Sequence, residues 1–333
     1  MKRTFWLVIL LGLLVTACAA TTPNDSAPWP TVSPDAHTIF HNGDILTMNP
    51  DQPQARAIAI LGEQIEAVGS DADVLALRRP DSVVIDLHGM TLMPGFVDAH
   101  THLFNDAEEY LDMTVAEAQQ VALANGITTI GDMFVTEDFL RQMREMNSAG
   151  QLLLRTSLYL VMTDNCGRVQ GDWWREYPPT RAPGERLRIG GVKIFADGGT
   201  CKKPALSYEL EPGVGLGDLF HSQDELNELV AEAQSAGFQV VIHAIGDRAI
   251  EQAQNAIAAA LDGQPNSFRH RIDHNSVIPP ELLPRYGEIG IVPVVFGLYP
   301  ICEPFGPPPP ADYQAWEWPW RALRDANPGL PIA

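Results

Sequence analysis

From residue 95 onward, this chain of 333 residues alternates between apolar strand-like segments and helical segments. After a first strand at 95–102, the expected strands are 127–134, 152–162, 188–196, 238–244, 268–277 and 291–298, with the start of another at 330–333. The expected helices are 115–124, 137–149, 222–236, 248–261, 280–288 and 313–326. The alternation predicts an α/β fold, a (β/α)₈ barrel of the TIM type whose eighth strand is incomplete. An open doubly wound sheet is the alternative, but no Gly-x-Gly-x-x-Gly motif follows the first strand to support a dinucleotide-binding version of it.

A different pattern precedes the barrel. Residues 37–90 alternate apolar and polar side chains, with turn residues at Asn42-Gly43 and Gly62-Glu63. This pattern predicts short antiparallel strands. We expect residues 37–90 to form part of a small N-terminal β-sandwich, and residues 91–333 to form the barrel.

The first 36 residues have the character of an export signal and a linker. Lys2 and Arg3 precede an apolar stretch at 5–15 that is too short to span a bilayer, and residues 15–18 read Val-Thr-Ala-Cys. This resembles the lipobox of bacterial lipoproteins, in which Cys18 would carry the lipid; an ordinary secretory signal is the alternative. Residues 19–36 then read as a flexible tether. We expect a signal peptide over 1–18 and an exported protein, lipid-anchored on the periplasmic or cell-surface side of a bacterial membrane.

The net charge of −20 argues against a nucleic-acid partner, because binding to phosphates depends on clustered lysine and arginine. A small-molecule substrate is the expected partner. The sequence carries no signal for the oligomeric state.

Three cysteines remain after Cys18: Cys166, Cys201 and Cys302. An odd number cannot all pair within one chain, and their spacing matches no metal-binding motif. A disulfide is compatible with export, but the sequence does not select the pair. We expect all three to be non-catalytic.

Two histidines end the first barrel strand, in the segment Pro94–Leu103. Side chains on a strand repeat every two residues, so His100 and His102 project from the same face. Two imidazoles at one strand end can hold a divalent metal ion, although such pairs also occur by chance on exposed strands.

Three further residues lie near the ends of later strands. Lys193 interrupts an apolar strand, where a lysine is costly unless it is paired, modified or able to reach the surface. His243 and His274 end the fifth and sixth strands. In a barrel, the C-terminal ends of the strands meet at one mouth, so these residues and the His100/His102 pair predict a site for one or two metal ions. Imidazole ligands suit zinc and similar ions.

Strand alternation also makes a prediction about the sixth strand, residues 269–274. It puts His270, Ile272 and His274 on one face of the strand and Asp273 on the other. Asp273 is therefore expected to point away from the site.

Four motifs, in order, resemble the amidohydrolase superfamily. They are Gly95-Phe-Val-Asp-Ala-His-Thr-His102, Gly191-Val-Lys-Ile-Phe-Ala-Asp-Gly198, His243-Ala-Ile-Gly-Asp-Arg-Ala249 and Arg271-Ile-Asp-His274. The closest branch is the YtcJ-like, N-substituted formamide deformylase-like group of amidohydrolase family 3, and the resemblance spans residues 37–333.

The resemblance implies a set of metal ligands and a reaction. His100 and His102 would bind a first ion, His243 and His274 a second, and Lys193, carboxylated on its amine, would bridge them. The implied reaction is hydrolysis of an amide or other non-peptide C–N bond by a metal-activated water.

The chain departs from the family pattern in two ways. The segment between His102 and the second strand is short, whereas this branch usually carries a long insertion there. In the family, the eighth strand ends in an aspartate that binds metal and accepts the proton of the water. The sequence here ends at Ala333, where that strand would begin. The strands that complete the small β unit in the family are also not part of it. We therefore expect a fragment of a longer gene product, with the catalytic aspartate beyond Ala333 and activity impaired by its absence; a naturally shortened, inactive protein is the alternative. Asp197, Asp247 and Asp273 are the substitutes available within the chain.

Two other functions are compatible with the same residues. A non-catalytic, surface-anchored binding lipoprotein would keep the barrel as a scaffold, since fold alone does not confer function. A metal-dependent hydrolase of esters or phosphoesters would use the same ligands.

Overall fold

The computed structural model describes residues 32–33, 35–180, 182, 184–199, 201–297 and 309–333. The expected signal peptide with Cys18, most of the expected tether, Leu298 of the seventh expected strand and Cys302 lie outside these residues. Contacts divide the chain into two compact units, with the boundary between Pro94 and Gly95. In the described part of the chain, no helix has both the length and the apolar character needed to cross a membrane.

The first unit contains two small β-sheets and a short helix. The four-stranded sheet has the order β5-β4-β1-β6, formed by β1 (His37–His41), β4 (Ala57–Leu61), β5 (Gln64–Gly69) and β6 (Val83–Asp86). The three-stranded sheet has the order β3-β2-β7, formed by β2 (Asp44–Leu46), β3 (Gln54–Ala55) and β7 (Thr91–Leu92). Helix α1 (Asp71–Leu75) begins at Ser70, whose side chain accepts the N–H of Asp73.

Strand direction in this unit differs in part from the expectation. β4 pairs antiparallel with both β1 and β5, but β1 pairs parallel with β6, and β2 pairs parallel with β7. Asn42 adopts a φ of 53° and leads from β1 into a different sheet, so Asn42-Gly43 does not close a hairpin. Helix α1 packs against the four-stranded sheet, and the core between them consists of Ile39, Ala57, Ala59 and, from α1 itself, Val74.

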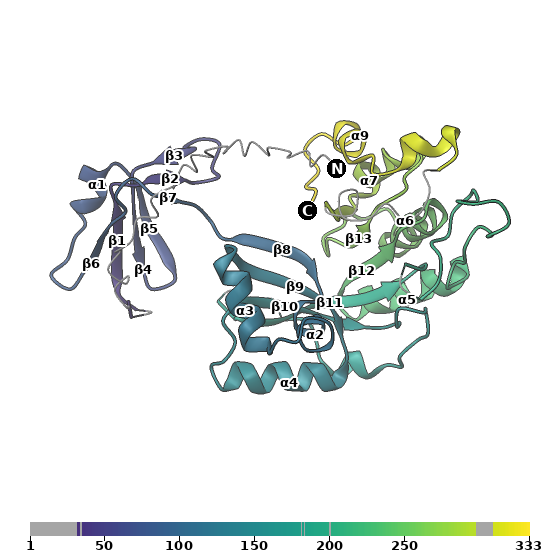
Figure 1. Cartoon of the computed structure of the whole chain (residues 1–333), viewed down its shortest axis with the longest axis horizontal. Helices are drawn as coiled ribbons and strands as arrows, with labels where there is room; N and C mark the ends of the chain where they lie inside the picture. Colours follow the sequence, from purple (N-terminus) through teal and green to yellow (C-terminus); the bar gives the residue numbers. More distant parts are fainter. Residues whose placement is uncertain (1–31, 34, 181, 183, 200, 298–308) are drawn as a thin grey trace, which may run out of the picture. The chain divides into compact units, whose positions relative to one another are not determined.

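The second unit is built on seven parallel strands that pair in chain order, and Figure 1 shows β8 to β13 side by side. They are β8 (Phe96–Thr101), β9 (Ile127–Val135), β10 (Arg155–Val161), β11 (Leu187–Phe195), β12 (Gln239–Ala244), β13 (Arg271–His274) and β14 (Val292–Val295). The sheet is a nearly closed barrel, which confirms the predicted fold class. Ala333 donates its N–H to Pro293 and accepts the N–H of Val295, so the chain begins to pair with β14 where an eighth strand was expected.

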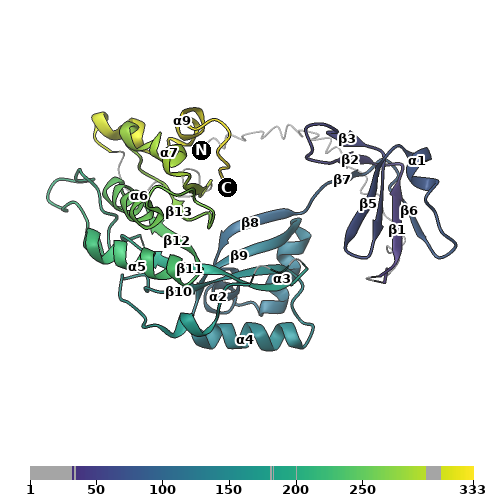
Figure 2. The same cartoon turned by 180° about the vertical axis from the view of Figure 1, so that it is seen from behind.

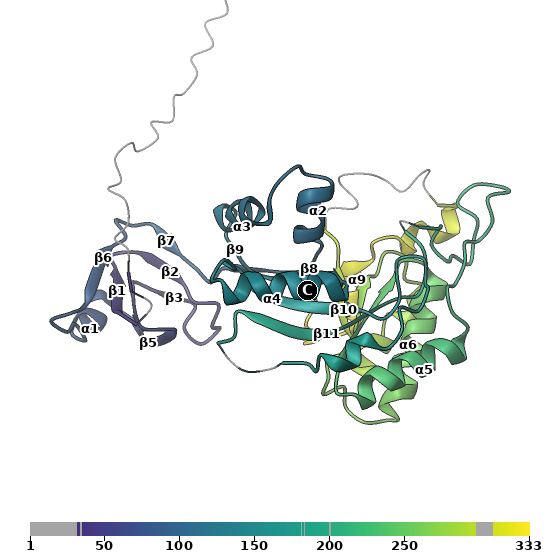
Figure 3. The same cartoon turned by 90° about the horizontal axis from the view of Figure 1, so that it is seen from below.

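Helices separate most of these strands. The α-helices are α2 (Leu103–Glu109), α3 (Val115–Ala124), α4 (Glu137–Ser148), α5 (Gln223–Ser235), α6 (Asp247–Leu261), α7 (Arg285–Ile289) and α9 (Trp320–Ala326), and the 3₁₀ segments are η1 (Trp173–Glu176), η2 (Pro280–Leu282) and η3 (Ala311–Trp316). Helices α5 and α6 contact each other, as Figure 2 shows. Helix α4, drawn from the side in Figure 3, contacts β11.

Capping explains where several of these helices begin. Thr114 and Ser222 each accept the N–H of a glutamate three residues later, while that glutamate bonds back to the cap, forming capping boxes for α3 and α5. The expected helix over 280–288 is instead split into η2 and α7, because Pro284 has no N–H to continue a helical ladder. Helix α2 was not expected.

The outer strands of the sheet, β8 and β14, do not pair with each other. A cleft of about 470 Å³ lies between them and is lined by Asp98 and His100 of β8, by Val294 of β14 and by Phe296, which follows β14. Phe96 and Val97, which the sequence places in an apolar run, are 55% and 65% exposed because they lie on this edge strand.

Candidate metal centre

The structure brings all five predicted ligands to the C-terminal end of the barrel strands. The ring centroids of His100 and His102 are 5.3 Å apart, those of His100 and His274 are 4.7 Å apart, and those of His243 and His274 are 4.4 Å apart. Lys193 is completely buried on β11, with its Nζ 5.0 Å from the centre of the Phe195 ring. We call this group the histidine cluster: His100, His102, Lys193, His243 and His274.

A break in strand alternation directs His274 into the cluster. His274 has a φ of 81° and Asn275 a φ of 53°, in the left-handed region that side chains other than glycine rarely adopt. The amide of Asn275 donates to the carbonyls of Ile272 and Val294, and its oxygen accepts the Tyr286 hydroxyl. These bonds hold the turn that ends β13, so backbone strain is located at the site.

Asp273 points into the barrel, contrary to the prediction from alternation. Its Oδ2 lies 2.5 Å from Nδ1 of His100 and 2.7 Å from Nη2 of Arg271. His270, which alternation paired with His274, instead bonds through Nδ1 to the N–H of Val240 and through Nε2 to the Gln234 side chain. The prediction failed because His274 leaves the regular strand geometry, so it no longer shares a face with His270.

The imidazoles of the cluster are held in the neutral form. Burial, followed by the charge of Lys193, lowers the pKa of His100 to about 4. Burial also lowers the pKa of His102 and of His243 to about 3, and that of His274 well below its usual range. Neutral imidazole is the form that binds metal ions.

Lys193 is the least satisfied polar group in the cluster. Its Nζ has no hydrogen-bond partner among the residues that the structure describes. Burial lowers its pKa to about 8, opposed by the nearby charge of Asp273. By contrast, Arg271 and His100 hold the pKa of Asp273 below its usual range despite its burial, so this carboxylate is ionised.

Hydrogen bonds fix which ring nitrogens remain available to an ion. The ionised Asp273 only accepts, so His100 donates from Nδ1 and keeps a lone pair on Nε2. The Gly198 carbonyl likewise accepts from Nε2 of His243 at 3.1 Å, which leaves Nδ1 of His243 with its lone pair. The donor set, with its unpartnered Lys193 amine, therefore fits a divalent ion chemically. Within the described ranges, however, no three His, Cys, Asp or Glu side chains are already arranged to hold an ion. The ring of His274 contacts the rings of His100 and His243 edge to face.

The two other aspartates considered as substitutes have structural partners. Asp197 accepts the N–H groups of Ala205, Ile245 and Gly246 at 2.8–3.0 Å, and its Oδ1 lies 3.6 Å from Nε2 of His243. Burial raises the pKa of Asp197 to about 7. Asp247, in the first turn of α6, accepts the N–H of Ser207 and is not part of the cluster.

Sequence reasoning did not identify the aromatic side chains around the cluster. The rings of Phe296 and Phe134 contact His100 and His102, with centroid separations of 5.5 Å and 6.3 Å, and Phe195 lies 4.9 Å from His243. A phenylalanine carries no chemical signal of its own in the sequence. Only its position after a strand that ends in the cluster could have indicated it.

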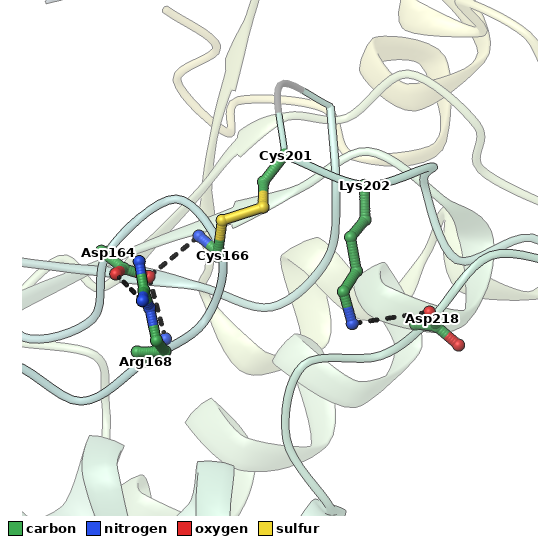
Figure 4. Close-up of a disulfide and its surroundings, with 6 residues drawn as sticks. All are labelled: Asp164, Cys166, Arg168, Cys201, Lys202 and Asp218. Carbon is green, nitrogen blue, oxygen red and sulfur yellow. Dashed lines mark hydrogen bonds and ion pairs between the residues drawn. A yellow bond between two sulfur atoms is a disulfide. The ribbon is translucent and has the colours of Figure 1, made fainter.

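The structure also selects a cysteine pair. Cys166, in the loop after β10, forms a disulfide with Cys201, in the loop after β11 (Figure 4). Their Cα atoms are 5.3 Å apart, within the normal range for disulfides. The cysteine spacing alone did not indicate this pair because the two loops meet only through the parallel pairing of their strands.

Comparison with known proteins identifies the family. The model of the amidohydrolase family matches residues 104–327, which is more than half of the chain. The chain belongs to the amidohydrolase family. The matched stretch of the chain includes Lys193, His243 and His274, whereas His100 and His102 precede it. The resemblance seen in the sequence is therefore confirmed.

Individual relatives match this chain over shorter stretches. YtcJ of Bacillus subtilis, whose own amidohydrolase assignment is provisional, is 32% identical over 133 residues, covering 39% of this chain and 23% of that protein. The N-substituted formamide deformylase of Arthrobacter pascens is 37% identical over 62 residues, covering 19% of this chain and 11% of that protein. The matches therefore cover less than a quarter of the length of either relative.

The fold of this chain resembles that of solved hydrolases. The structure of an uncharacterized metal-dependent hydrolase from Pyrococcus furiosus superposes with a TM-score of 0.73 at 18% sequence identity, covering 90% of this chain and 85% of that one. At this identity the likeness is one of fold.

Proposed function

We propose that this chain is a metal-dependent amidohydrolase that cleaves an amide or another non-peptide C–N bond. The observation that carries the proposal is the convergence of four neutral imidazoles on a buried amine that has no hydrogen-bond partner among the described residues. Such an arrangement is costly in a purely structural core, because buried polar groups are normally bonded. The membership of the family supports the same reaction class.

The residues of the cluster would bind one or two ions, with zinc as the expected metal. His100 and His102 would hold the first through the nitrogens not used in hydrogen bonds, and His243 and His274 the second. When bound, a divalent ion supplies a water with a pKa of about 7 and a Lewis acid for the substrate carbonyl. Asp273 would keep the His100 ring oriented, as partners of metal-binding histidines generally do.

Carboxylation of Lys193 would complete the cluster. With a pKa near 8, roughly a tenth of the amine is neutral at pH 7. The neutral amine can add to carbon dioxide, forming the N–C bond of a carbamate and releasing one proton. The product replaces a buried cation with an anionic oxygen ligand, which removes the cost of burying the ammonium group.

Proton transfer distinguishes this function from a non-catalytic one. Oδ1 of Asp273 has no hydrogen-bond partner among the described residues, but Arg271 and His100 hold the pKa of this carboxyl below its usual range, which makes it a weak base. Both oxygens of Asp197 accept backbone N–H groups, so neither carboxylate is well suited to accept a proton from water. We therefore expect the 333-residue chain to hydrolyse substrates slowly and to be accelerated by added formate, which would act as an external base. A non-catalytic binding lipoprotein would bind the metal and show no hydrolysis under either condition.

Hydrolysis of a substrate panel tests the proposal. The panel contains N-substituted formamides, other amides, carboxylic esters and a phosphoester, assayed with the purified chain before chelation, after chelation and after zinc is restored. We expect amide hydrolysis that chelation and His102→Ala abolish and that the exposed-surface control His88→Ala preserves. Hydrolysis that survives both chelation and His102→Ala contradicts the proposal, as does a metal-loaded chain that is inactive with formate present. Activity confined to esters or phosphoesters would identify the alternative hydrolase.

We also propose that the protein is exported and anchored by lipid on Cys18. The support is the basic start, the short apolar stretch and the small residues before Cys18. Expression with labelled palmitate in a bacterial host should label the chain, and Cys18→Ser should abolish labelling. A labelled Cys18→Ser variant would contradict the assignment.

A further inference from the structure

We propose that the Cys166–Cys201 disulfide is a positioning crosslink of the metal centre, which keeps the loop after β11 pressed against His243. The inference rests on the proposed metal-binding function of the cluster. The disulfide joins the loops that follow two adjacent strands, β10 and β11, at the same end of the barrel as the cluster. Breaking it should weaken metal binding although neither cysteine touches the metal ligands.

The Cys166 side of the crosslink is a rigid turn. Oδ1 of Asp164 accepts the N–H groups of Cys166 and Arg168 at 2.9 Å and 3.0 Å, and its Oδ2 accepts from Nε of Arg168 at 2.8 Å (Figure 4). Thr163 pairs with Val169 across the base of the turn. A cysteine held in such a turn can act as a fixed anchor for the loop to which it is bonded.

On the Cys201 side, the loop contacts His243 through the nearby residues Gly198 and Gly199. The Gly198 carbonyl accepts the His243 Nε2–H, which leaves Nδ1 as the metal-binding nitrogen. A Cβ atom placed on Gly199 would lie 2.8 Å from Cδ1 of Ile245 and 3.4 Å from Cε1 of His243, so the loop backbone packs against the imidazole. The loop therefore determines both the tautomer and the position of the His243 ring.

Besides the disulfide, noncovalent contacts hold the tip of this loop: Nζ of Lys203 donates to the Val214 carbonyl at 3.3 Å, and the backbone of Gly198 packs against that of Lys202. Asp197 closes its base through the N–H of Ala205, but Gly198 and Gly199 are consecutive glycines, which lose the most conformational entropy on ordering. Beyond Cys201, the ion pair of Lys202 with Asp218 spans 3.6 Å between side chains that are 52% and 68% exposed, and exposed pairs contribute little (Figure 4). The disulfide adds a covalent restraint at the tip to these contacts.

The crosslink also makes metal binding sensitive to thiols. A dithiol reductant would break the S–S bond, form the two cysteine thiols and become oxidised to its own disulfide. The released tip would no longer hold the Gly198 carbonyl on His243. Loss of a partner that orients a metal-binding histidine typically lowers metal affinity by about 10- to 100-fold, so we expect a loss of at least about tenfold.

The test compares zinc affinities of variants of the 333-residue chain by competition with a chromophoric chelator. Cys166→Ser/Cys201→Ser removes the crosslink without creating thiols that themselves bind zinc, and Lys202→Ala is the matched control that removes the neighbouring ion pair but keeps the disulfide. Gly199→Ala keeps the disulfide and displaces the loop from His243. We expect at least about a tenfold loss of affinity for the double variant and for Gly199→Ala, and none for Lys202→Ala.

The outcomes separate this inference from the proposed function. Wild-type zinc affinity in a folded double variant, or in Gly199→Ala, overturns the positioning role and leaves the metal centre intact. Failure of the wild-type chain to bind zinc overturns both. If the double variant does not fold, Gly199→Ala alone decides. A shift of the His243 ring resonances in the double variant, without a shift for His270, would further distinguish a local effect from general loosening.

Discussion

Nδ1 of His100 lies 2.5 Å from Oδ2 of Asp273, and this oxygen also accepts from Arg271 at 2.7 Å. The Asp273 carboxylate therefore links the His100 ring to the guanidinium of Arg271. Arg271 in turn donates to the Ala99 carbonyl and lies over the Tyr159 ring. The orientation of the His100 ring is therefore set by a residue 173 positions away in the chain.

Asp273→Asn tests this connection. The change removes the charge that orients His100 and balances Arg271, so we expect zinc affinity to fall by about 10- to 100-fold. Leaving Arg271 without its charged partner should also lower the free energy of unfolding by about 3–5 kcal/mol. Zinc titration and urea unfolding measure the two effects. Asp138→Asn, which breaks an exposed ion pair with Arg141, should change the unfolding free energy by less than about 1 kcal/mol. An unchanged zinc affinity in Asp273→Asn would show that Asp273 does not orient the ligand.

Lys193→Met separates stability from function. Methionine has a similar length and fills the buried space without a charge, so the unfolding free energy of the metal-free chain at pH 7 should rise. The upper limit is about 3 kcal/mol, set by the lowering of the lysine pKa from 10.5 to about 8. Hydrolysis should be lost because the bridging ligand is lost. Urea unfolding of metal-free protein measures the first effect, and destabilisation there would mean that the Lys193 amine has a stabilising partner.

Acid should destabilise the metal-free chain. Burial gives several histidines pKa values near 3–4 in the folded state: His100, His102, His243 and His270. The unfolded chain takes up these protons below about pH 6.5, so the stability that the neutral histidines contribute is lost as the pH falls from 6.5 towards 4. Burial raises the pKa of Asp132 and of Asp197 to about 7, so these two groups favour the folded state as the pH falls. They are outnumbered by the four histidines, whose effect therefore dominates.

Urea unfolding at several pH values measures this dependence. We expect the unfolding midpoint to fall between pH 6.5 and 4 at a constant m value, with a slope of about 1.4 kcal/mol per pH unit for each net proton taken up. Saturating zinc should stabilise the chain most at the upper end of this range, because protons compete with the ion for the same nitrogens. A midpoint that stays constant or rises on acidification would contradict the neutral, buried histidine cluster.

Local signals in the sequence were sufficient for most of the barrel and for the position of the cluster. The capping boxes at Thr114 and Ser222 and the apolar strands that end in His243 and His274 depend on neighbouring residues, which the sequence displays directly. The barrel topology then brings separate strand ends to one mouth, so the five predicted ligands could be placed together without coordinates.

The features that were missed depend on single backbone angles or on long-range contacts. The direction of Asp273 could not be obtained from alternation because the left-handed turn at His274 and Asn275 is held by Tyr286 and Val294, which belong to other elements. The Cys166–Cys201 pair is likewise a consequence of which loops the parallel sheet brings together. The parallel pairing of β1 with β6 could not be predicted, because the alternation of apolar and polar residues is the same in parallel and antiparallel strands.

Elemental analysis of the purified 333-residue chain, after dialysis against zinc and then against metal-free buffer, is the most direct test of the metal centre. We predict one or two zinc ions per wild-type chain and per His88→Ala chain, and less than half an ion in a folded His100→Ala/His243→Ala variant, which removes one ligand from each half of the cluster. A wild-type chain that retains no zinc, or a double variant that retains as much as the wild type, would contradict a metal centre at His100, His102, Lys193, His243 and His274.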